Sequence, residues 1–155
     1  MPLASAKDAV VDAVGAVIQK MGDEGFDPKT EWAKVAEAFF SQGLNPVWIS
    51  HDAGKAAFSA AFNPTLPAPG AAMATFPLAW IAYAATASAS TAPLPPGVSV
   101  TPPIGPPGMP AVTGADKPPD HTLYATQLFT ELIKWAVTGL VKAPVPPGPP
   151  TTPWS

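Results

Sequence analysis

The sequence predicts a mainly α-helical protein: a small bundle of about four to five helices with a long Pro/Gly-rich extended arm and a Pro-rich C-terminal tail. Several segments repeat apolar residues at the three- and four-residue spacing of a helix with one buried face. Residues 93–119 instead contain ten prolines and four glycines, a density that excludes a regular helix and a central strand. With 155 residues the chain is long enough for one domain with its own core.

The first two helices have distinct sequence signals. A stripe of valines within residues 3–21 predicts the first helix. Asp27 followed by Pro28 predicts the start of the second, because a carboxylate can accept the free amide hydrogens and proline fits the first turn. We expect this second helix to end before Gly43.

A third and a fourth helix are expected in the middle of the chain. The third follows the pair Asn45 and Pro46 and ends at Phe62, and Gly54 together with a second cap at Ser50 could divide it. An Ala-rich run over residues 71–89 predicts the fourth helix, whose proline would lie in its first turn.

The final helix is expected to begin at Asp120, which can act as its cap, and to run to about Lys142. The best strand candidate, Val98 to Thr101, is too short to support a sheet alone. These signals divide the chain into an N-terminal helical region (1–91), the extended arm (92–119), a C-terminal helix packing on the same domain (120–142) and a Pro-rich tail (143–155).

Composition excludes several classes of function. The chain has no cysteine, which excludes disulfide scaffolds, thiol catalysis and thiolate metal sites. All basic residues are lysines and the net charge is −3, so direct binding of nucleic acid is not expected. Charged residues make up 12% of the chain, about half the usual share.

The low charge is concentrated in residues 56–115, which contain no charged side chain. An arm exposed to water normally carries many polar groups, so we expect other protein to cover much of this stretch. The alternative is an exposed linker between two helices. A membrane-associated helix over residues 71–89 is a further alternative, although small residues dominate it and no basic residue flanks it.

Candidate catalytic and metal-binding residues are few. The histidines occur in the pairs His51-Asp52 and Asp120-His121, where neighbouring side chains do not face each other on a helix. Both pairs are interpreted as polar residues at helix ends, and no cofactor or metal is expected. A small enzyme or metal-binding domain would need the two histidines to meet.

Trp154 is a large apolar side chain in a Pro-rich segment, and two interpretations are open: an anchor in a partner's pocket, or a frayed tail. Together with apolar residues of the charge-free stretch it forms the set of expected partner-binding residues: Trp80, Tyr83, Leu94, Val98, Val100, Ile104, Met109 and Trp154.

Three stretches, FPLAWIAYAATASAS, PLPPGVSVTPPIGPPGMPAV and TTPWS, together with the order of helices, arm and tail, resemble small virion proteins of tailed bacteriophages and related contractile particles. Such proteins cement capsids or lie in the tail, collar or baseplate. The resemblance implies a structural role and supplies no enzymatic residues.

We therefore expect a non-enzymatic structural component of a large oligomeric particle, most simply a phage virion or tail. Its partners would be other copies of itself or other virion proteins, with no small-molecule substrate. Lys7, Asp8 and Asp12 interrupt the apolar opening, so no secretion signal is expected and the location would be the virion. The alternatives are the membrane-associated protein and a small helical adaptor that binds one protein partner.

Overall fold

Five α-helices and a small sheet make up the described part of the computed structural model, which comprises residues 3–20, 23–41, 51–63, 75–86, 99–108, 121–142 and 151–154. The helical elements are the 3-10 turn η1 (Leu3–Ala6), α1 (Lys7–Lys20), α2 (Pro28–Phe40), α3 (His51–Ala61), α5 (Phe76–Ala85) and α6 (His121–Ala136). The strands are β1 (Ser99–Thr101), β2 (Leu140–Lys142) and β3 (Thr151–Pro153). The predicted mainly helical class is confirmed.

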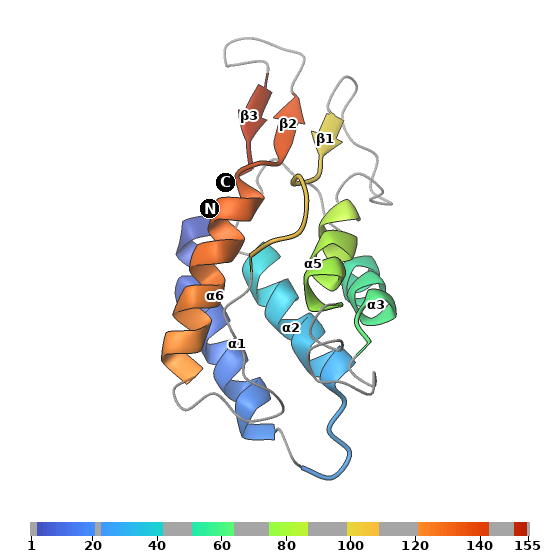
Figure 1. Cartoon of the computed structure of the whole chain (residues 1–155), viewed down its shortest axis with the longest axis vertical. Coiled ribbons are helices and arrows are strands. Elements are labelled where there is room, and N and C mark those ends of the chain that lie inside the picture. The colour runs from blue at the N-terminus through green and yellow to red at the C-terminus, as the bar shows by residue number, and fades with distance from the viewer. Residues whose placement is uncertain are drawn as a thin grey trace.

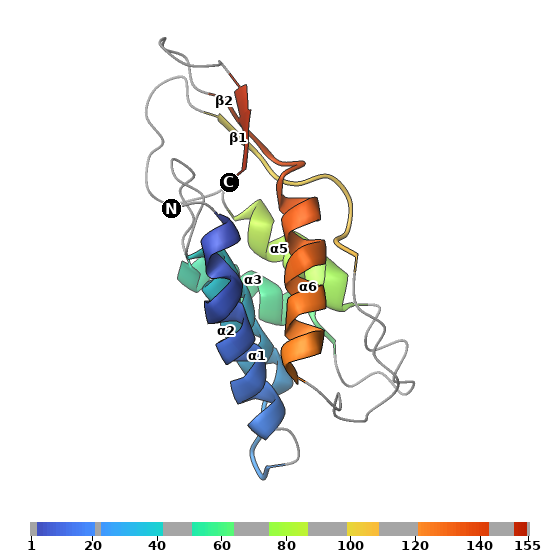
Figure 2. The same ribbon diagram turned by 90° about the vertical axis from the view of Figure 1, so that its left-hand side faces the viewer.

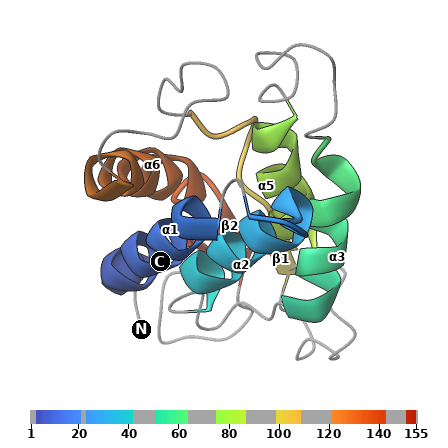
Figure 3. The same cartoon turned by 90° about the horizontal axis from the view of Figure 1, so that it is seen from below.

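The helices form a curved row in the order α6, α1, α2, α3, α5, in which each packs against the next (Figure 3). The sheet lies beyond one end of the helices, above them in Figure 1, and the turn between α1 and α2 lies at their opposite end. A view at right angles shows the same separation of helices and sheet (Figure 2). The molecule therefore has a helical end and a sheet end.

The predicted start of α2 is confirmed in its details. Asp27 occupies the N-cap position, and its Oδ1 accepts a hydrogen bond from the Lys29 amide at 3.2 Å. The Thr30 hydroxyl donates to Oδ2 of the same carboxylate at 2.6 Å. Pro28 stands at the first helical position, where its missing amide hydrogen has no consequence.

The next two helices are shorter, within the described residues, than the spans that the sequence predicts. α3 begins at His51, and the expected start at Asn45 lies outside the described residues. α5 begins at Phe76, within the span 71–89 whose ends also lie outside the described residues. The Thr75 side chain does not cap α5, because its oxygen accepts the Asn63 amide at 2.8 Å.

The predicted extension of the last helix to Lys142 is wrong. α6 ends at Ala136, and Leu140–Lys142 forms β2 instead. Thr138 closes the helix by donating its hydroxyl to the Trp135 carbonyl at 2.7 Å, and Gly139 follows. Leu140 continues the helical stripe of the sequence, so periodicity alone could not distinguish helix from strand here.

Three short strands form one antiparallel sheet in the order β1, β2, β3. Thr101 and Pro153 lie on either side of Leu140 in the register. The strand candidate at 98–101, of which Ser99–Thr101 forms β1, is thus stabilised by pairing with β2, which the sequence did not reveal as a strand. Pro153, which cannot donate a ladder hydrogen bond, lies on an edge strand, where proline is tolerated.

Aromatic side chains from several helices meet in the core. The Phe40 ring of α2 stacks on Tyr83 of α5 with centroids 4.8 Å apart and an interplanar angle of 14°. Phe39 meets Trp80 of α5 and Phe129 of α6 in edge-to-face contacts at 6.0 and 6.1 Å. These contacts join α2, α5 and α6, and each aromatic pair adds about 0.5–1.5 kcal/mol beyond its burial.

The cap of α2 makes stability depend on pH. Hydrogen bonds from the Thr30 hydroxyl and the Lys29 amide hold the pKa of Asp27 below its ordinary value of 3.8. The ionised carboxylate therefore stabilises the fold above about pH 4, and this stabilisation is lost as the pH falls further. Asp27→Asn keeps the capping acceptor without the titration, so its melting temperature should fall less steeply with acid than that of the wild type. Parallel acid slopes in thermal melts would contradict this assignment.

Gly54 provides the close contact between α3 and α5. A Cβ atom at this position would lie 2.6 Å from Cε1 of Tyr83, which is closer than carbon atoms pack. Glycine to alanine in a helix normally stabilises by about 0.5–1 kcal/mol, but Gly54→Ala should destabilise by roughly 1–3 kcal/mol through overpacking. Ala60→Gly, at an exposed site of the same helix, is the control for propensity. Urea unfolding followed by circular dichroism measures both, and a gain in stability for Gly54→Ala would refute the contact.

Candidate interaction surface

The described part of the arm, residues 99–108, docks on the chain's own last helix. The indole Nε1 of Trp135 donates to the Gly105 carbonyl at 2.7 Å, and the Ile104 amide donates to Thr138 Oγ1 at 2.9 Å. Gly105 has a φ of +68°, a conformation suited to glycine. Figures 1 and 2 show this segment running from β1 along α6. These described residues of the arm therefore lie against the chain's own last helix.

Three of the expected partner-binding residues are part of the chain's own core. Trp80 and Tyr83 on α5 are 0% exposed, and Trp154 is 1% exposed. A partner meeting the described conformation would therefore not reach them. The absence of charge within α5 is explained by burial against the chain's own helices.

The remaining expected residues are placed as follows. Leu94, Val98 and Met109 lie outside the described residues. Val100 belongs to β1, where its backbone lies opposite Val141. Ile104 is the expected residue that the structure shows to be open to solvent, with 76% of its surface exposed.

Two further apolar side chains are exposed close to Ile104. Val137 is 46% exposed and Leu140 39%, and they flank the pair Thr138-Gly139, of which Thr138 accepts the hydrogen bond of the Ile104 amide. We name Ile104, Val137 and Leu140 the apolar cap. Sequence analysis missed Val137 and Leu140 because it placed them inside a helix. The Thr138-Gly139 pair was the signal that could have ended the helix earlier.

Trp154 is held in a notch at the base of the sheet. Its amide donates to the Gly139 carbonyl at 3.0 Å, and its ring meets Phe40 edge to face at 6.4 Å. A Cβ on Gly139 would lie 2.8 Å from the indole, so glycine is what makes room for the ring. The buried indole Nε1 has no hydrogen-bond partner. The notch has room for the indole ring but offers no hydrogen-bond acceptor to its Nε1.

A polar cluster joins α2, α3 and α5. His51 Nδ1 lies 2.7 Å from the Tyr83 hydroxyl, and Lys55 Nζ lies 2.9 Å from Glu37 and 3.7 Å from Asp52. Burial, followed by the charges of Glu37 and Asp52, raises the pKa of Tyr83, so the phenol stays protonated at neutral pH. The hydrogen bond to Glu37 raises the pKa of Lys55. The interpretation of His51 and Asp52 as polar residues at a helix end is confirmed, and the cluster fastens α3 to its neighbours.

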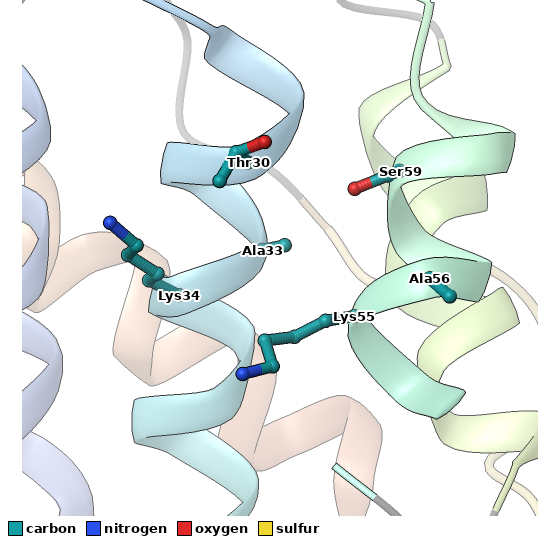
Figure 4. A pocket seen from close by; sticks show the side chains of 6 residues that line it. All are labelled: Thr30, Ala33, Lys34, Lys55, Ala56 and Ser59. Atoms are coloured by element: carbon teal, nitrogen blue, oxygen red, sulfur yellow. The ribbon is translucent and has the colours of Figure 1, made fainter. Parts of the chain in front are cut away.

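A small pocket of about 270 Å³ opens between α2 and α3 (Figure 4). The lining residues are Thr30, Ala33, Lys34, Lys55, Ala56 and Ser59. Lys34 is paired with Glu31 at 3.2 Å and Lys55 with Glu37, so both cations are already neutralised. The pocket is smaller than most ligand sites and offers little free charge.

Within the described ranges, no three His, Asp or Glu side chains form a group that could hold a metal ion. None of the helices described is long and apolar enough to cross a membrane. Comparison with protein-family models, curated proteins and solved structures found no match to the chain.

The burial of Trp154 predicts its contribution to stability. Trp154→Ala should lower the free energy of unfolding by roughly 3–5 kcal/mol, since it empties a fully buried site. Ile104→Ala, the control, removes another expected partner residue from an exposed site and should change it by less than about 0.5 kcal/mol. Chemical denaturation of the two variants measures the difference. Equal, small effects would mean that Trp154 is not part of the core.

Proposed function

We propose that the chain is a non-enzymatic structural subunit that assembles with other copies of itself through the apolar cap. The observation that carries the proposal is the exposure of three large apolar side chains on a base fixed by hydrogen bonds from Trp135 and Ile104. Burying one such side chain contributes about 1.5–3 kcal/mol. A surface that is already ordered loses little entropy when it binds.

The distribution of charge also points to the sheet end of the molecule as the contact surface. The described ion pairs all join side chains on helices, such as Lys20 with Glu31 and Lys134 with Glu131. Among residues 99–108, 139–142 and 151–154, Lys142 is the only charged residue. The sheet end can thus be covered by protein at little desolvation cost.

The particle that we propose is a bacteriophage virion or tail, with other virion proteins as further partners. This finer proposal is supported by the resemblance of the Ala-rich helix, the arm and the tail to small virion proteins. The membrane-associated alternative would require α5 to leave the core, because Trp80 and Tyr83 are buried there. The adaptor alternative predicts a monomer that binds a single partner protein.

The test is sedimentation velocity of the full-length chain over a range of concentrations. The wild type should form species heavier than the 15.8 kDa monomer. Ile104→Lys combined with Val137→Lys should shift it to monomer with an unchanged melting temperature, because both side chains are exposed. The control is Leu78→Lys combined with Leu123→Lys, which changes two exposed apolar residues on α5 and α6.

Two results would contradict the proposal. Equal dissociation in the cap variant and the control would show that the cap has no special role. A wild-type chain that remains monomeric at high concentration would exclude self-assembly and favour the adaptor.

A further inference from the structure

We infer that the strap, which we define as residues 151–154, exchanges between copies, so that β3 and Trp154 of one chain pair with β2 and fill the Gly139 notch of another. The inference rests on the proposed function for the identity of the partner, a second copy, but it uses a different contact. In this arrangement two subunits are linked because a strand of one chain pairs with a strand of the other.

The seat of the strap lies entirely on residues that precede the connector 143–150. It consists of the β2 backbone, the Gly139 carbonyl and the Phe40 ring. Every copy therefore offers the same seat. A second copy's strap would form the same hydrogen bonds and the same ring contact as the chain's own strap, so exchange is nearly neutral in contact energy.

The connector between β2 and β3 is longer than an ordinary hairpin loop. β2 and β3 are antiparallel neighbours, so in one chain the connector must reverse direction. Hairpin loops usually have two to five residues, whereas this connector has eight, of which five are proline. Proline-rich segments prefer an extended conformation of about 3.1 Å per residue. The length and proline content of the connector are thus compatible with a span to a neighbouring molecule.

Apart from the burial of Trp154, few contacts hold the strap on its own chain. Pro153 has no amide hydrogen to donate to β2, and the indole Nε1 of Trp154 is buried without a partner. The pairing covers three residues. Release of the strap therefore disrupts few contacts besides the burial of one indole, which the second copy restores.

Disulfide trapping tests the exchange on the full-length chain, because the sequence contains no other cysteine. Val141→Cys and Thr152→Cys are placed in two separate chains, since Val141 and Thr152 are opposite each other in the register. Directly opposite Cα atoms lie within the range that a disulfide bridges. The two variants are mixed, incubated at high concentration and mildly oxidised.

Exchange predicts a covalent dimer of twice 15.8 kDa on a non-reducing gel. Its yield should exceed that of the matched control by about tenfold, because pairing raises the effective concentration of the two thiols. The control is Val141→Cys mixed with Asp12→Cys, whose thiol lies on an exposed position of α1. A yield equal to the control would overturn the inference.

A second cysteine pair and a cap variant make the result unambiguous. Lys142→Cys with Thr151→Cys, also register partners, repeats the test should one of the first variants fail to fold. Trapping in the background of Ile104→Lys and Val137→Lys separates the two proposals. A persistent cross-link there supports exchange independently of the cap, whereas oligomers without cross-links in either pair would refute exchange and leave the cap as the contact.

Discussion

The structure depends on the ring of Phe40, where segments far apart in the sequence converge. Tyr83 stacks on it from α5, and Trp135 and Trp154 meet it edge to face at 6.4 Å from α6 and the strap. Each of these contacts closes a long loop of chain, which is entropically costly and is offset by the burial of large apolar surface. Phe40 thereby joins α5, the last turn of α6 and the strap in one aromatic cluster.

Two glycines make this convergence possible. Gly54 admits the Tyr83 ring against α3, and Gly139 admits the indole of Trp154. Both positions would be overfilled by a single methyl group, so they define how closely the elements approach. In each pair the glycine on one element makes room for the ring on the other. The need for a glycine cannot be predicted from the sequence around it, because the ring comes from a distant segment.

The helical class and the start of α2 could be predicted from sequence, because caps and periodicity are local. Asp27 with Pro28 is an example, since all the atoms that form the cap lie within four residues. The sheet and the position of Trp154 could not be predicted, because strands of three residues have no periodicity and their pairing is decided by distant backbone. Likewise, absence of charge indicates coverage but does not say by which molecule. In α5 the chain's own core provides that coverage.

Ile104 shows the opposite case: it belongs to the same charge-free stretch as α5, but its side chain is exposed to solvent. The arm could have turned this side chain towards the helices, but hydrogen bonds to Trp135 and Thr138 fix the backbone on either side and leave the side chain in solvent. Because the backbone is held in place, a local rearrangement does not remove this apolar side chain from water. Its solvent contact is relieved when protein covers it, and the strap emerges from the same end of the molecule (Figure 1). An exchanged strand would align two copies at this end, and the cap would supply apolar area through its own separate contact.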